Sequence, residues 1–325
     1  MCTAVTYQTK DFYFGRNLDL HVSYNEKITI TPRRYPFHFR NGTVVAHHYA
    51  IIGMAAIADG YPLYYDATNE KGLSLAGLNF PDNAVYQALN DHKENVAPFE
   101  LIPWILSRCG SVTEALKMLQ GISLWNGAFS PQYPLSPLHW LLSDKYQSVV
   151  LEPLADGLRI IENPVGILTN NPPFEYHMYN LANYMNLTRQ KPNNRFSEKI
   201  ELKPYSLGIG GFGLPGDLSS GSRFIKAAFT KLNSLSGNSE SESISQFFHI
   251  LGSVTQQRGL TEVDNEQYEY TIYSSCCNTD KGIYYYTTYE NSQICAVAMM
   301  NEDLDGEELV VYPLIKKQQV NIQNI

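Results

Sequence analysis

Cys2 stands where a catalytic nucleophile can arise, because removal of Met1 makes it the first residue of the chain. A small residue after the initiator methionine favours that removal. The processed residue carries a thiol with an ordinary pKa of about 8.5 and an α-amine with one of about 7.7–8.0. The amine is therefore partly neutral near neutral pH and can accept the thiol proton, directly or through a water molecule. This pair predicts a terminal nucleophile that supplies its own base.

Two charged residues, Arg16 and Asp19, are expected to lie beside Cys2. The β-rich runs 3–9 and 12–16 flank a polar break at Lys10–Asp11, which predicts a hairpin. A hairpin brings its outer ends together, so the second strand returns to the start of the chain. A guanidinium there would favour the thiolate. A carboxylate there could hold the α-amine.

The hairpin belongs to a chain whose strand and helix signals fall into separate blocks. Strand patterns fill the first third, and helical patterns follow at 98–109 and 111–119, where Ser111 and Glu114 have the spacing of a capping box. Strands return at 148–152, 158–161 and 166–169, amphipathic helices follow at 224–232 and 244–254, and strands close the chain. Separate blocks favour a layered α+β fold over a doubly wound parallel sheet. Because no linker divides the sequence, residues 1–325 are predicted to form a single domain.

Composition limits the classes of partner. The net charge is −8 and the basic residues are dispersed, so neither nucleic acid nor an anionic membrane surface is expected as a partner. No run of 18 apolar residues predicts a transmembrane helix. The N-terminus lacks a basic segment followed by an apolar one, which predicts a cytoplasmic location.

The cysteines argue against a disulfide framework, the histidines against a metal site and the glycines against a nucleotide site. The five cysteines are odd in number in a large chain, and no two of the eight histidines have zinc-ligand spacing. Gly208–Gly213 reads G-x-G-x-x-G, but Leu214-Pro215-Gly216 prolongs a loop where a nucleotide site would open a helix. We therefore expect a glycine-rich loop and neither a metal nor an organic cofactor.

Motifs along the whole chain are typical of one enzyme family. They lie at 1–3, 14–19, 69–73, 76–81, 138–140, 166–172, 213–217, 222–224 and 270–275. With these motifs the chain resembles the choloylglycine hydrolase family of N-terminal nucleophile hydrolases, which contains bile salt hydrolases and penicillin V acylases. It most resembles the bile salt hydrolases of lactobacilli and enterococci. The resemblance implies a four-layer αββα sandwich of two antiparallel sheets between helical layers, and a homotetramer.

The resemblance also implies the roles of individual residues. Cys2 would be the nucleophile and its amine the base, with Asp19 orienting the amine and Arg16 supporting the thiolate. Asn170 and Asn79 would donate hydrogen bonds to the oxyanion, and Arg223 would stabilise the site electrostatically. Neutral amides suit an oxyanion because a carboxylate would repel it.

The substrate implied by the resemblance is a glycine or taurine amide of a bile acid. A flat apolar steroid needs an apolar slot, for which the candidates, each equally compatible with plain core packing, are Leu20, Tyr24, Ala58, Tyr65 and Phe129. Attack by Cys2 would give a cholyl thioester that water then hydrolyses. Asn79 favours bile salts, since penicillin V acylases of the family often carry an aromatic residue there. Three alternatives remain: a penicillin V or other N-acyl acylase, a catalytically silent steroid binder, and a papain-like protease, for which no local signature is present.

Overall fold

Two antiparallel sheets form the centre of the molecule. The structure, a computed structural model, describes residues 1–324. Within this range the first sheet has the strand order β14-β1-β2-β16-β17-β18, with β15 paired to β16. Its strands are β1 (Cys2–Gln8), β2 (Phe12–Leu20), β14 (Ile167–Leu168), β15 (Thr261–Asp264), β16 (Gln267–Asn278), β17 (Ile283–Thr288) and β18 (Cys295–Ala298).

The second sheet has the order β13-β12-β11-β8-β7-β6-β3-β19. Its strands are β3 (Lys27–Thr31), β6 (Ile51–Ala58), β7 (Tyr61–Asn69), β8 (Ser74–Asn79), β11 (Leu138–Ser143), β12 (Ser148–Leu154), β13 (Gly157–Glu162) and β19 (Val310–Pro313). Two small pairs stand apart, β4 (Phe37–His38) with β5 (Val44–Val45), and β9 (Glu94–Val96) with β10 (Ile122–Leu124).

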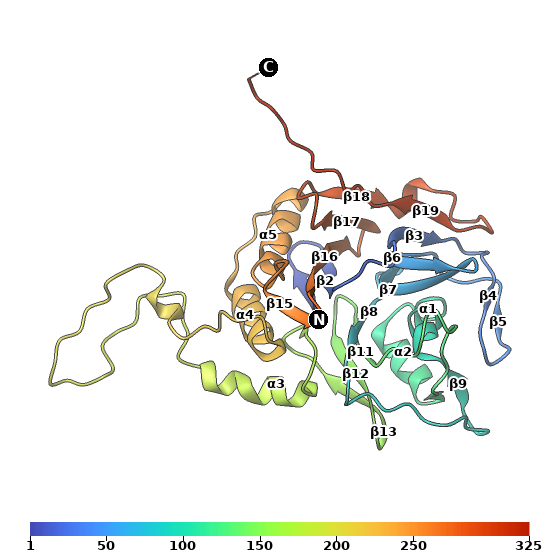
Figure 1. The fold of residues 1–325 in the computed structure, drawn as a ribbon, viewed down its shortest axis with the longest axis horizontal. Helices are drawn as coiled ribbons and strands as arrows, with labels where there is room; N and C mark the ends of the chain where they lie inside the picture. Colours follow the sequence, from blue (N-terminus) through green and yellow to red (C-terminus); the bar gives the residue numbers. More distant parts are fainter. Residues whose placement is uncertain (325) are drawn as a thin grey trace.

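Helices cover the outer faces of both sheets (Figure 1). On the first sheet, α4 (Ser220–Asn233) and α5 (Glu240–Gly252) contact the strands, whereas α1 (Leu101–Leu106) contacts β7 and β8 of the second sheet. The other helices are α2 (Val112–Leu119), α3 (Phe174–Asn180) and the 3₁₀ turns η1 (Pro98–Glu100), η2 (Leu181–Tyr184), η3 (Ile209–Gly211) and η4 (Met299–Asn301). This order of helix, sheet, sheet and helix confirms the predicted αββα sandwich.

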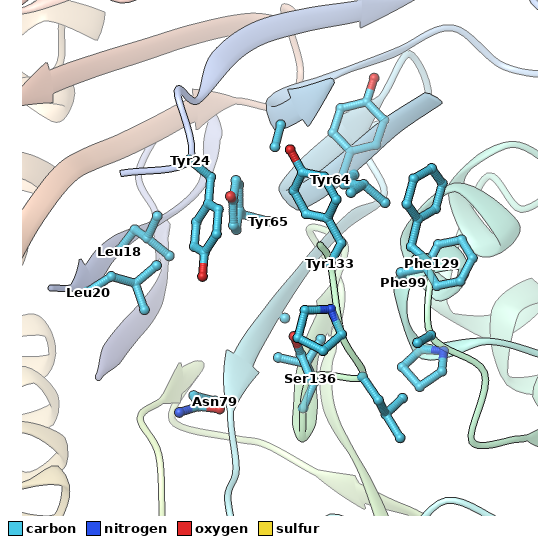
Figure 2. A pocket seen from close by; sticks show the side chains of 18 of the residues that line it. Leu18, Leu20, Tyr24, Tyr64, Tyr65, Asn79, Phe99, Phe129, Tyr133 and Ser136 are labelled. Carbon is cyan, nitrogen blue, oxygen red and sulfur yellow. The ribbon is translucent and has the colours of Figure 1, made fainter. Parts of the chain in front are cut away.

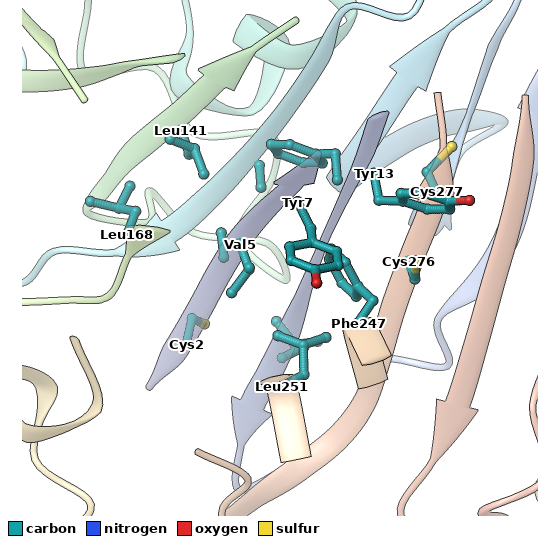
Figure 3. Close-up of a cluster of buried hydrophobic side chains, with 14 of the residues drawn as sticks. Cys2, Val5, Tyr7, Tyr13, Leu141, Leu168, Phe247, Leu251, Cys276 and Cys277 are labelled. Atoms are coloured by element: carbon teal, nitrogen blue, oxygen red, sulfur yellow. The ribbon is translucent and has the colours of Figure 1, made fainter. Parts of the chain in front are cut away.

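The start of the chain is buried because both faces of its sheet are covered. Every residue of β1 except Gln8 is buried, and so is all of β2 except Leu20. On the helical side, Val5 and Tyr7 belong to the same apolar cluster as Phe247 and Leu251 of α5 (Figure 3). Cys276 and Cys277 are buried free cysteines of β16 and pack as small residues in this cluster.

Several predicted elements differ in detail. The helix predicted at 98–109 is split into η1 and α1. Ser111 caps α2 by accepting from the Glu114 N–H at 3.2 Å, but the Glu114 carboxylate accepts from Gly110 instead of closing the predicted box. The segment 208–213 lies in the long excursion between η2 and α4 and contains the single turn η3. No helix in the described part of the chain is long and apolar enough to cross a membrane.

Candidate active site

The β1–β2 hairpin places Arg16 and Asp19 near Cys2, but on opposite faces of the sheet. Cys2 pairs with Leu18, and Ala4 pairs with Arg16. Because directly paired residues point the same way and neighbours alternate, Cys2 and Arg16 face the second sheet, whereas Asp19 faces the helices. The hairpin prediction is therefore confirmed, and the face of each residue is a result of the structure.

Arg16 is a fully buried cation beside the thiol. Its Nη1 donates to the carbonyls of Gly77 at 2.5 Å and Tyr65 at 3.0 Å, while Nη2 has no partner among the described residues. Burial works against the charge, but Cys2 and nearby acidic groups outweigh it and raise the pKa of Arg16 above its ordinary value.

Asp66 is an acidic neighbour of Arg16 that the sequence did not reveal. Its carboxylate, buried between the sheets, accepts from the hydroxyls of Tyr273 and Tyr284, each at 2.6 Å, and of Ser275 at 3.2 Å. Burial raises the pKa of Asp66, and Arg16 opposes that shift. No local motif marks this residue, because its hydroxyl partners come from β16 and β17 of the opposite sheet.

Asp19 has unused acceptor capacity at the start of the chain. Its Oδ1 accepts from the Thr271 hydroxyl at 2.6 Å, whereas Oδ2 is buried and has no hydrogen-bond donor among residues 1–324. Burial raises the pKa of this carboxyl. The structure retains Met1, whose ammonium donates to the Asp19 carbonyl and to Glu269, both at 2.7 Å.

Arg223 and Asn170 surround the backbone of Cys2. The Cys2 N–H and Arg223 Nη2 both donate to the Asn170 side-chain oxygen at 2.7 Å. Arg223 Nη1 also donates to the Cys2 carbonyl at 2.5 Å and to the Thr3 hydroxyl at 2.6 Å. The Asn170 side-chain amide donates to the Asn79 backbone carbonyl at 2.7 Å, so Asn170 contacts the backbone of Asn79 through this bond.

Two buried histidines hold the backbone that carries Asn170. His139 Nε2 donates to the Thr169 carbonyl at 2.9 Å, and His177 Nε2 to the Asn170 carbonyl at 3.0 Å. Both nitrogens must carry the proton, because a carbonyl only accepts. His139 is held in turn by Glu152 at 3.2 Å. None of these three residues was predicted as a site residue. His139 lies in the 138–140 motif but was given no role, and the sequence did not predict α3, which carries His177.

A cavity of about 260 Å³ includes Cys2, Arg16 and Asn79 in its wall. Four of the five slot candidates line it, namely Leu20, Tyr24, Tyr65 and Phe129. Ala58 does not line it: it is the last residue of β6, beside the turn to β7, and Ala56 on the same strand face lines the cavity instead.

The rest of the cavity wall is largely apolar and aromatic, and includes Leu18, Leu63, Tyr64, Phe99, Gln132, Tyr133, Leu135, Ser136 and Leu138. Figure 2 shows Asn79, Leu18 and Leu20 toward one end and Phe99 with Phe129 at the other, with Tyr24 and Tyr65 between them. Of the loop after β10, Phe129 was predicted, but Gln132, Tyr133, Leu135 and Ser136 were missed, because an irregular loop has no hydrophobic period to read.

Similarity to known proteins spans nearly the whole chain. Residues 2–312 match the family described as linear amide C–N hydrolases, choloylglycine hydrolase family. The chain is 59% identical to the bile salt hydrolase/transferase of Lactiplantibacillus plantarum over 98% of both chains. It is 37% identical to a protein of the same name from Clostridium perfringens, over 100% of both.

Solved structures agree with this similarity. The C2A mutant of a conjugated bile acid hydrolase from Clostridium perfringens superposes with a TM-score of 0.92 at 36% identity, covering 100% of both chains. A penicillin V acylase from Agrobacterium tumefaciens gives a TM-score of 0.72 at 18% identity, covering 95% of this chain and 90% of the other. The second likeness supports the fold alone.

Proposed function

This chain belongs to the choloylglycine hydrolase family of linear amide C–N hydrolases, and from that membership we propose that it hydrolyses the amide bond of glycine- and taurine-conjugated bile acids. The observation that carries the proposal is the 59% identity, over 98% of the chain, to a protein named bile salt hydrolase/transferase. The cavity supports it, because its aromatic and aliphatic wall suits a flat apolar acyl group and it begins at Cys2.

The proposed chemistry starts with removal of Met1. The Cys2 nitrogen, which donates to the Asn170 oxygen in the unprocessed chain, then becomes a free α-amine. The unpaired Oδ2 of Asp19 supplies an acceptor that can orient this amine. The amine takes the thiol proton, and the thiolate, favoured by Arg16, attacks the amide carbonyl carbon.

The remaining steps release the amino acid and then the bile acid. The side-chain amides of Asn170 and Asn79 are the proposed donors to the tetrahedral oxyanion, a type of donor whose single removal costs about 3–4 kcal/mol. The protonated α-amine gives its proton to the departing nitrogen as the C–N bond breaks, which leaves a Cys2 thioester. Water, deprotonated by the same amine, then cleaves the thioester and restores the thiol.

The test compares kcat/KM for glycocholate, taurocholate and penicillin V. We expect both bile salts to exceed penicillin V; the reverse order would replace the proposal with the acylase alternative. Cys2→Ser should abolish turnover while still binding glycocholate, and full activity in this variant would refute the mechanism. Intact mass of active enzyme should lack Met1, because a retained methionine removes the proposed base.

Acyl transfer to amines is a second candidate, favoured by the word transferase in the names of two relatives, 59% and 37% identical to this chain. An amine can attack the thioester in place of water, forming a C–N bond as the C–S bond breaks. Glycocholate incubated with excess leucine should then give a leucine conjugate, detected by mass spectrometry. Cholate as the sole product would limit the enzyme to hydrolysis.

We further propose that the protein is a cytoplasmic homotetramer whose chains each form a single domain. The excursion between η2 and α4 projects from the body and exposes large apolar side chains that a second copy could cover: Phe196 (81% exposed), Tyr205 (80%), Leu207 (84%) and Phe212 (75%). Light scattering should give four times the chain mass, and a monomer would refute the assembly. Cell fractionation and a single cooperative unfolding transition test the other two parts.

A further inference from the structure

The end of the cavity that lies away from Asn79 is built from aromatic rings of three separate segments. Phe99 comes from η1, Phe129 from the loop after β10, and Tyr61 from the start of β7. The Phe99 and Phe129 rings meet edge to face at 5.3 Å between centroids, and Tyr61 lies 5.9 Å from each. Phe99 and Phe129 line the cavity (Figure 2). Since neither segment belongs to a sheet, other contacts must set the spacing of these rings.

Arg40 makes contacts of this kind from outside the cavity. It lies in the connection between β4 and β5, and its guanidinium sits 5.9 Å from the Phe99 ring centroid and 5.7 Å from that of Phe129. Both distances lie within the range of cation–π attraction. Arg40 Nη2 also donates to the Phe129 carbonyl at 2.6 Å. One side chain thus contacts both rings and the backbone of one of them.

Arg40 supplies a hydrogen bond to the middle of the loop that carries Phe129. Its ends are held by the Asn126 N–H, which donates to the Gln87 carbonyl, and by the Ser136 carbonyl, which accepts from the Tyr86 hydroxyl. Ser130 and Tyr133 bond to each other within the loop. Within the described structure, residues 127–133 make one hydrogen bond to another segment of the chain, in which the Phe129 carbonyl accepts from Arg40.

Glu100 anchors Arg40 and the Phe99 segment together. This buried carboxylate accepts from the Arg40 N–H at 2.7 Å and from the Ala97 N–H at 3.0 Å. Because Glu100 directly follows Phe99, the backbone of Arg40 is bonded to the segment that carries Phe99. The side chain of Arg40 is bonded to the segment that carries Phe129. Arg40 itself is exposed, so replacing it leaves no buried group unpaired.

We propose that Arg40 is a positioning residue that fixes the Phe99–Phe129 end of the cavity and thereby sets the preference for a long acyl group. The proposal rests on the bile-acid substrate proposed above. A steroid extends from Cys2 along the cavity to this end, whereas a small reagent at the thiol does not. Loss of Arg40 should therefore weaken binding of the steroid without slowing the chemical step.

Arg40→Ala tests the proposal with three measurements. KM for glycocholate should rise about tenfold with kcat unchanged, from the loss of one charged hydrogen bond and two cation–π contacts. Hydrogen–deuterium exchange of residues 127–136 should be faster than in the wild type. The rate of Cys2 alkylation by iodoacetamide should stay the same, because the thiol end is intact. Arg34→Ala, at an exposed arginine nearby, is the matched control and should change none of the three.

The outcomes separate this inference from the proposed function. An unchanged KM refutes the role in preference, and unchanged exchange at 127–136 refutes the anchoring. A fall in kcat together with slower alkylation also refutes the proposal, because Arg40 would then act through the thiol end. If the wild type does not cleave glycocholate, the proposed function fails, while the exchange measurement still decides whether Arg40 anchors the loop.

Discussion

Replacing Arg223 with methionine should separate the electrostatic support of Cys2 from the nucleophile itself. Arg223 is 1% exposed and donates to four acceptors: the Leu218 and Cys2 carbonyls, the Thr3 hydroxyl and the Asn170 side-chain oxygen. Methionine has a similar length but no donor. Arg223→Met therefore removes one donor from each of these acceptors while filling much of the same space. The Asn170 oxygen keeps the Cys2 N–H, and the Leu218 carbonyl keeps the Gln256 amide.

The magnitude follows from the buried contacts. One unsatisfied buried polar group costs about 1–3 kcal/mol, but removing the cation also removes its own desolvation penalty. We expect a net loss of about 3–5 kcal/mol in the free energy of unfolding, because several hydrogen bonds to a charged donor, worth about 1.5–3 kcal/mol each, are lost and only part of that is offset by the desolvation penalty. Asn170 also loses one of the two hydrogen bonds to its side-chain oxygen, so kcat should fall by about 10²–10³-fold if its amide is an oxyanion donor.

The assay pairs steady-state kinetics on glycocholate with guanidinium unfolding. Arg223→Lys is the control: it keeps the charge, but one ammonium cannot serve acceptors on both sides of Cys2, so stability should be intermediate and kcat still low. KM should change little in either variant, because Arg223 does not line the cavity. A folded Arg223→Met enzyme with kcat within about threefold of the wild type would refute the reasoning.

Three further predictions concern other buried or capping groups. Burial lowers the pKa of Lys231 to about 8, so between pH 8 and the ordinary pKa of 10.5 the unfolded state binds more protons than the folded state. The free energy of unfolding should therefore rise with pH across this window. Lys231→Met should abolish that rise, as measured by urea midpoints at a series of pH values. Ser111→Ala should cost about 1 kcal/mol in unfolding free energy, through loss of the α2 cap, with unchanged kcat/KM. His177→Phe removes the donor to the Asn170 carbonyl and should lower kcat about tenfold at unchanged KM; a rise in KM alone would assign it to binding.

The start of the active site could be predicted because it is local. Alternating apolar residues and the break at Lys10–Asp11 define the β1–β2 hairpin, and the pairing of Cys2 with Leu18 follows from that turn. The capping serine of α2 is equally local. Asn79, Asn170 and Arg223, by contrast, were assigned through family resemblance, since no spacing in the sequence links them to Cys2.

The partners of these residues depended on packing between distant segments. Asp66 meets Tyr273 only because the two sheets stack, and Arg40 meets Phe129 only because two irregular connections cross at one end of the cavity. Ala58 illustrates the limit: strand patterns were predicted for its part of the chain, but its place outside the cavity wall was not. A local pattern specifies the period of an element and which face is apolar, whereas the contacts of that face depend on how the sheets and loops pack against one another.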